Sequence, residues 1–158
     1  MPGYTYLDHA ATTPMHPESV AAMMPYLSEQ FANPSGSHRF AREARKAIDD
    51  ARELMAEVVG CRPGEVVFTS GGTEADNTAI RGTLARRGGR AVCPAAEHHA
   101  VLECVHRADG IVVPTTVTGA ADLDALAGAL EQSTDVSVVS VMTVNNEVGT
   151  INDIAGVA

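Results

Sequence analysis

The chain has 158 residues, of which 45% are apolar and 20% are charged, and its formal net charge at pH 7 is −9. This length allows one domain with a buried core, and the balance of apolar and charged residues is ordinary for a globular protein. The net negative charge argues against nucleic acid or an anionic membrane as a partner, because both attract clustered positive charge.

The first 60 residues are predicted to be mainly helical. Residues 16–31 have a proline near their start and apolar side chains at helical spacing, which predicts a helix. Residues 32–37 are rich in turn-forming residues and are expected to form a loop. A second helix is expected to use Ser37 as its cap and to run to about Val59, where Gly60 is a natural stop.

The rest of the chain alternates between short apolar runs and helical patterns. The run over residues 136–144 is nearly all apolar or small, as expected for a strand that is buried on both faces. Short connections between alternating elements favour an α/β fold with a mostly parallel sheet and flanking helices. Strands are expected at residues 65–70, 91–95, 111–117 and 136–144, and helices at about 74–87, 98–108 and 123–132.

The tail of the sequence, residues 152–158, is apolar and stops without a cap. A sheet of this kind seldom ends on a central strand whose covering helix is missing. We therefore expect the sequence to be part of a longer chain.

Cysteine usage and hydropathy point to a compartment. No apolar run approaches the ~20 residues of a membrane span, and the first 14 residues lack the basic and apolar segments of a secretory signal. Cys61, Cys93 and Cys104 show no spacing pattern, which fits a reducing compartment better than a disulfide framework. We expect a cytoplasmic protein without a membrane span, whose cysteines are packing residues rather than nucleophiles.

A Gly-Gly-Thr turn before the helix at 74–87 is the strongest local motif. Glycines let backbone N–H groups approach an anion, and a helix N-terminus adds unpaired donors and a partial positive charge. The hydroxyl of Thr73 supplies one more donor, so the motif predicts a phosphate cradle at Gly72 and Thr73. A plain turn with a threonine helix cap is the alternative that the motif alone leaves open.

Two further motifs follow predicted strands. An imidazole at His98 can stack on a heteroaromatic ring and transfer a proton, although an exposed histidine at a helix start would look the same; His99 is expected to point away from it and to be structural. The amides of Asn145 and Asn146 can donate hydrogen bonds to a ring oxygen or a substrate carboxylate, unless they only form a turn. Because all three motifs lie at carboxyl ends of strands, together they suit a phosphorylated heteroaromatic cofactor.

These motifs resemble those of the cysteine desulfurase family, class V members of the fold-type-I pyridoxal-phosphate (PLP) enzymes. The resemblance covers essentially the whole chain, in the same order and spacing. It implies an incomplete large domain of the PLP-transferase (fold type I) fold over residues 15–158, preceded by a substrate-side segment over residues 1–14. The resemblance rests on Tyr6–Pro14, Asn33–Ser35, Phe68–Asn77, Glu97–His98, Ala100–Leu102 and Val144–Gly149.

The resemblance also implies roles for four residues. Gly72 and Thr73 match positions that bind the PLP phosphate. His98 matches the histidine that stacks on the ring and takes part in proton transfer, so it is the candidate catalytic residue. Asn146 matches the residue near the ring oxygen and the substrate carboxylate. The implied reaction releases sulfur from L-cysteine as an enzyme persulfide plus L-alanine. The implied protein is a cytoplasmic homodimer that passes sulfur to an acceptor protein, as in iron–sulfur cluster assembly.

The sequence departs from the family where covalent chemistry is concerned. Its only lysine, Lys46, lies in a predicted helix among arginines and aspartates and is expected to be a solvated charge. None of the cysteines matches the persulfide-forming one, and Ala41 stands where the family usually has glycine, a change that a helix tolerates. We therefore expect the 158-residue chain alone to be inactive.

Three other hypotheses remain at this point. The chain could be a truncated, non-catalytic module that binds PLP or phosphate, or part of another class V PLP lyase such as selenocysteine lyase. A metal site would need His98, His99, Cys104 and His106, but their spacing fits no standard zinc pattern, so no metal is expected.

Overall fold

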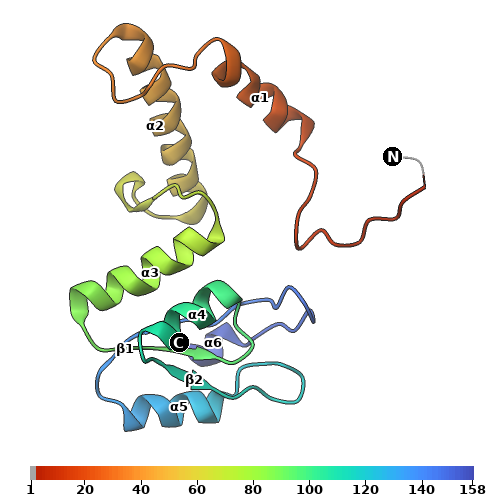
Figure 1. The fold of residues 1–158 in the computed structure, drawn as a ribbon, viewed down its shortest axis with the longest axis vertical. Coiled ribbons are helices and arrows are strands. Elements are labelled where there is room, and N and C mark those ends of the chain that lie inside the picture. Colours follow the sequence, from red (N-terminus) through yellow and green to blue (C-terminus); the bar gives the residue numbers. More distant parts are fainter. Residues whose placement is uncertain (1–2) are drawn as a thin grey trace. The chain divides into compact units, whose positions relative to one another are not determined.

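A computed structural model describes residues 3–158 and divides the chain into two compact units between Phe68 and Thr69 (Figure 1). The boundary that we expect after residue 14 stays a prediction. Residues 1 and 2 of the predicted N-terminal segment lie outside the described residues.

The first unit holds α1 (Pro17–Ser28), α2 (Arg39–Val59) and a 3₁₀ turn, η1 (Pro63–Glu65). Helix α1 ends three residues earlier than expected and has no buried side chain. Helix α2 stops at Gly60, as predicted, because this residue adopts a left-handed φ of 72°.

The N-terminal cap of α2 differs from the prediction. The cap is His38, not Ser37, and its Nδ1 accepts a hydrogen bond of 3.2 Å from the N–H of Ala41. Ala41 is fully buried, so it fills a packed position and not a solvent-facing one.

The strand expected at residues 65–70 is wrong. The chain between η1 and Ser70 is irregular, and no strand of the described residues pairs with it. A side chain holds this segment instead: Arg52 donates a 3.1 Å hydrogen bond to the carbonyl of Val66, and its guanidinium lies 5.1 Å from the ring centroid of Phe68. An apolar run predicts a strand only if a neighbouring strand can take its backbone hydrogen bonds.

The second unit is a three-stranded parallel sheet with helices on both faces (Figure 1). The strand order is β2-β1-β3, so β1 is central, and the α/β prediction with a mostly parallel sheet is confirmed. The elements are α3 (Gly72–Arg87), β1 (Arg90–Pro94), α4 (His99–Arg107), β2 (Ile111–Val113), α5 (Leu123–Gln132), β3 (Val136–Val139) and α6 (Ile154–Val157).

Two strands are shorter than expected. Strand β2 ends at Val113, before a proline and a turn, and β3 ends at Val139 with its side chains only half-buried. The prediction that β3 is buried on both faces is therefore wrong. Within the tail, α6 has an N-terminal cap: Asp153 accepts a 3.0 Å hydrogen bond from the N–H of Gly156.

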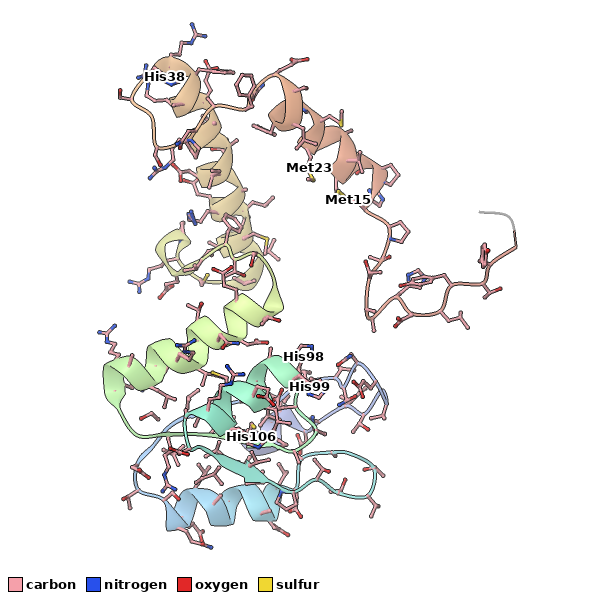
Figure 2. All side chains as sticks on the ribbon, viewed as in Figure 1. Met15, Met23, His38, His98, His99 and His106 are labelled. Atoms are coloured by element: carbon pink, nitrogen blue, oxygen red, sulfur yellow. The ribbon has the colours of Figure 1, made fainter. Side chains whose placement is uncertain are left out.

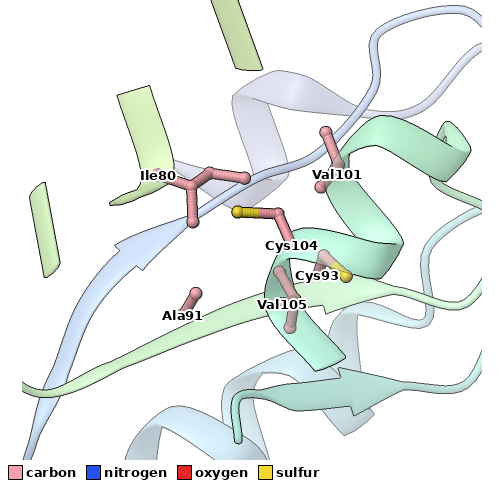
Figure 3. Close-up of a cluster of buried hydrophobic side chains, with 6 residues drawn as sticks. All are labelled: Ile80, Ala91, Cys93, Val101, Cys104 and Val105. Carbon is pink, nitrogen blue, oxygen red and sulfur yellow. The ribbon is translucent and has the colours of Figure 1, made fainter. Parts of the chain in front are cut away.

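The core lies on both sides of β1 because successive strand residues point to opposite faces. Ala91 and Cys93 face α3 and α4, where they join a buried cluster (Figure 3). Val92 faces the other way, against Leu126 of α5. The cluster on the α3 and α4 side consists of Ile80, Ala91, Cys93, Val101, Cys104 and Val105.

Burial in this cluster predicts a stability difference between two identical substitutions. Val105 is 0% exposed, whereas Val117 in the loop after β2 is fully exposed. We expect Val105→Ala to lower the free energy of unfolding by about 2 kcal/mol, since it removes two buried methyl groups and leaves a cavity. Val117→Ala should change it by less than about 0.5 kcal/mol. Urea denaturation followed by circular dichroism measures both, and equal effects would contradict the assigned core.

None of the helices within residues 3–158 is long and apolar enough to cross a membrane.

Candidate functional site

The start of α3 offers free backbone donors. The first intrahelical hydrogen bond runs from the N–H of Ala75 to the carbonyl of Gly71, and no side chain caps the helix. The N–H groups of Gly72, Thr73 and Glu74 therefore lack an intrahelical partner. A Cβ built on Gly72 would meet no atom within 4 Å, so the surface beside these donors is open.

The acidic side chain in this first turn, Glu74, is hydrogen-bonded to Ser70, which precedes the helix. Both the N–H and the hydroxyl of Ser70 donate 2.7 Å hydrogen bonds to Oε2 of Glu74. These bonds hold the pKa of Glu74 below its usual range. The helix start is thus predicted to bind an anion through neutral N–H groups, the Thr73 hydroxyl and the positive end of the helix dipole.

His98 is the N-terminal cap of α4. Its Nδ1 accepts a 3.1 Å hydrogen bond from the N–H of Ala100. An accepting Nδ1 carries no proton, so the neutral ring is protonated at Nε2. The backbone N–H of His98 donates to Oε2 of Glu97 at 3.2 Å. The ring orientation is therefore set by the chain itself.

Two cavities share His98. The first has a volume of about 580 Å³ and is lined by Thr73 of α3 together with His98 and Arg107. The second has a volume of about 280 Å³ and is lined by His98 and by the loop after β3, including Asn146. The structure thus brings three of the predicted site residues to adjoining cavities, while Gly72 lies next to Thr73 but lines neither cavity.

The paired asparagines have different surroundings. Asn145 is half-buried: Nδ2 donates a 3.0 Å hydrogen bond to the carbonyl of Ala96, and Oδ1 accepts from the N–H groups of Glu147 and Val148 at 2.8 and 3.0 Å. Asn146 is exposed and forms no side-chain hydrogen bond within residues 3–158. Asn145 is thus engaged by the fold, and Asn146 is available to a ligand.

Sequence reasoning gave His99 the wrong direction. His99 lines both cavities with His98, and the two ring centroids are 6.5 Å apart. Both histidines lie at the start of α4 (Figure 2). The expectation of opposite directions assumed regular geometry, but His98 is an extended cap residue and His99 is the first helical one.

Asn77 is a further residue that the sequence reasoning left without a role. Its Nδ2 donates to the carbonyl of Thr73 at 2.9 Å and to that of Ala100 at 3.3 Å. No local pattern could have revealed the second bond, because its partner lies 23 residues away. Asn145 carried a weak signal, since asparagine often accepts from backbone N–H groups two residues on.

Lys46 and two of the three cysteines lie where the sequence predicts. Lys46 is exposed on α2 and forms an i,i+4 ion pair with Asp50 at 2.6 Å, as a solvated charge would. Cys93 and Cys104 are buried, as expected of packing residues. Burial, with the nearby charge of Glu97 adding to it, raises the pKa of the Cys93 thiol to about 12. Cys61, however, is exposed, so its reading as a packing residue is wrong.

Among the residues that the structure describes, no cluster of His, Cys, Asp and Glu could hold a metal ion.

A family model described as Aminotransferase class-V matches residues 5–158. The chain belongs to this family. It is 47% identical, over 162 aligned residues, to a protein of Mycobacterium tuberculosis (strain ATCC 25618 / H37Rv) named IscS-like cysteine desulfurase, covering 95% of this chain and 41% of that protein. It is 44% identical to the cysteine desulfurase IscS of Dictyoglomus turgidum (strain DSM 6724 / Z-1310), covering 94% and 39%.

Solved structures give a similar result. A NifS-like protein from Rickettsia africae ESF-5 superposes with a TM-score of 0.84 at 30% identity, covering 95% of this chain and 42% of that chain. DndA from Streptomyces lividans superposes with a TM-score of 0.74 at 34% identity, covering 96% and 44%. The chain spans about 40% of the length of the curated relatives it matches.

A PLP cofactor is a property of the class V family, and the residues present here fit one. A phosphate group needs hydrogen-bond donors and no nearby carboxylate that faces it. The start of α3 supplies unpaired N–H groups, while Glu74 is bound to Ser70. A flat ring fits beside an imidazole with fixed orientation, and His98 has one.

The thiols offer a direct check on burial. We expect a disulfide-exchange reagent to label only Cys61 in the native chain, because Cys93 and Cys104 are 0% and 5% exposed. All three should react in 6 M guanidinium chloride, which unfolds the chain and serves as the control. Peptide mapping identifies the labelled thiol; rapid native labelling of Cys93 would contradict this structure.

Proposed function

We propose that the whole protein to which these residues belong is a PLP-dependent cysteine desulfurase, which releases sulfur from L-cysteine as an enzyme persulfide and forms L-alanine. The observation that carries this proposal is the position of His98 at both cavities, with Thr73 at one and Asn146 at the other. The likeness to proteins named cysteine desulfurase supports the choice of reaction.

The chain's own residues would bind PLP in three places. The Thr73 hydroxyl and the first N–H groups of α3, including that of Gly72, would hold the phosphate. The His98 ring would stack on the cofactor ring, and the Asn146 amide would donate to the ring oxygen or to the substrate carboxylate. When bound, PLP supplies an electron-withdrawing ring that stabilises negative charge on the substrate carbon.

His98 would act as a proton donor from Nε2. Its Nδ1 is engaged by the N–H of Ala100, so the neutral ring has its proton on the other nitrogen. To donate, the ring would first take up a second proton from solvent at Nδ1, which releases the N–H of Ala100. The imidazolium would then give its Nε2 proton to a departing sulfur or to a substrate carbon and become neutral again.

We assign the covalent steps to residues outside positions 1–158. Lys46 is exposed in an ion pair and Cys93 is buried, so neither suits a covalent role. The segment 1–14 would lie on the substrate side of a large domain formed by residues 15–158 and the rest of that protein. We further propose a cytoplasmic homodimer with a sulfur-acceptor protein as partner, as in iron–sulfur cluster assembly.

A non-catalytic PLP- or phosphate-binding module is the second candidate function. It is favoured by one observation: the cofactor-side residues gather at the two cavities, while the only lysine lies in a solvated ion pair. Formation of L-alanine from L-cysteine by the longer protein would exclude it.

The phosphate cradle can be tested on this chain with pyridoxine 5′-phosphate, which has no aldehyde and cannot react with amines. Thr73→Val removes one hydroxyl donor to an anion, so we expect binding to weaken about tenfold. Thr78→Val makes the same change on an exposed residue of the same helix and should leave the dissociation constant within about twofold. Calorimetric titration measures both, and equal affinities for the two variants would contradict the cradle.

The role of Lys46 can be tested with PLP and borohydride. One equivalent of PLP, followed by reduction, is expected to leave no stoichiometric adduct on Lys46, because its ammonium is solvated and paired with Asp50. Mass spectrometry of the digested chain locates any adduct, and Lys46→Arg provides the background from the N-terminal amine. A stoichiometric adduct that disappears in Lys46→Arg would overturn the assignment of the covalent lysine to another segment.

A further inference from the structure

Two amide side chains hold the segment around His98 from opposite sides, and neither needs to touch a ligand to do so. Asn77 lies on α3 and Asn145 follows β3. Both are half-buried. Each donates a hydrogen bond to a backbone carbonyl within two residues of His98.

Asn77 connects the phosphate side to this segment. Its Nδ2 lies 2.9 Å from the carbonyl oxygen of Thr73 and 3.3 Å from that of Ala100. The N–H of Ala100 is in turn the donor that fixes the His98 ring. Three hydrogen bonds therefore run in series from the residue that would hold a phosphate to the imidazole that would stack on a ring.

Asn145 connects the amide-donor side to the same segment. Its Nδ2 donates to the carbonyl of Ala96, two residues before His98. Its Oδ1 accepts from the N–H groups of Glu147 and Val148, which closes a turn around Asn146. Because one side chain makes both connections, the exposed amide of Asn146 is held at a set distance from the imidazole.

We propose that Asn77 and Asn145 are positioning residues that fix the spacing of Thr73, His98 and Asn146. This inference rests on the proposed function, since it assumes a ligand whose phosphate and ring are bound at the same time. Such a ligand gains affinity from correct spacing, whereas a probe that uses one contact only does not. A merely structural role would lower stability without changing this selectivity.

The two probes are pyridoxine 5′-phosphate and inorganic phosphate. Asn77→Ser and Asn145→Ser are uncharged and too short to reach the distant carbonyl, and serine can still close a turn more weakly. We expect each variant to bind pyridoxine 5′-phosphate about fivefold to tenfold more weakly and inorganic phosphate within about twofold of the unmodified chain. Calorimetric titration gives the ratio of the two affinities.

Ser137→Ala is the matched control. It removes a 2.7 Å hydrogen bond from the Ser137 hydroxyl to the carbonyl of Gly88, at the opposite end of the strands. We expect it to leave the affinity ratio unchanged, even if stability falls. Circular dichroism and urea denaturation confirm folding. If a serine variant does not fold, Asn77→Gln and Asn145→Asp replace it, since the first keeps an amide and the second keeps the turn acceptor. Each should still lose at least twofold in the ratio.

A double-mutant comparison separates the two sides. Asn145 is inferred to act on Asn146 through the turn and on the His98 segment through Ala96, so Asn145→Ser should have a smaller effect in an Asn146→Ala background, whereas Asn77→Ser should retain its full effect there. An undiminished effect of Asn145→Ser, or equal weakening of both probes by Asn77→Ser, would overturn the inference. If the unmodified chain prefers the ring-bearing probe but no variant alters that preference, this inference alone fails. If the unmodified chain shows no preference, the proposed function fails with it.

Discussion

The parallel pairing of β1 with both β2 and β3 is the constraint on which the candidate site depends. Parallel strands end at the same edge of a sheet, so the segment after central β1 and the loop after β3 must emerge side by side. His98 lies on the first and Asn146 on the second. Val92 and Cys93 are buried on opposite faces of β1, so the strand is packed between two helical layers and this edge is kept in place.

The helix starts on either side of the first cavity use their unpaired N–H groups in opposite ways. At α4, the His98 imidazole accepts from one of them, which settles the ring's orientation and tautomer. At α3, no side chain caps the helix and Glu74 is bound to Ser70, so the donors stay available. An imidazole used as a cap cannot also accept a ligand proton at Nδ1, and uncapped N–H groups favour an anion. The two functions proposed for this edge follow from that difference.

Strand lengths show where pattern reasoning about the fold reached its limit. The alternation of elements predicted the α/β class and the parallel sheet correctly, because hydrophobic periodicity reports which residues face a core. It overestimated the lengths of β2 and β3, and it wrongly predicted a strand at residues 65–70. An apolar run reports burial, whereas a strand needs a partner for its backbone groups. The carbonyl of Val66 accepts a hydrogen bond from the guanidinium of Arg52 and not from a neighbouring strand.

The sequence by itself determined the class of the fold and the family, and it proposed the residues that would bind a phosphorylated ring, because the hydrogen-bonding chemistry of glycine, threonine, histidine and asparagine can be recognised from residue type and order alone. Only the tertiary structure decided how those residues are held. It showed that His99 shares the cavities with His98, that Asn145 rather than Asn146 is used by the fold, and that Asn77 joins two helices. The reason is distance along the chain: these hydrogen bonds join residues 23 and 49 positions apart, and no local pattern encodes such partners.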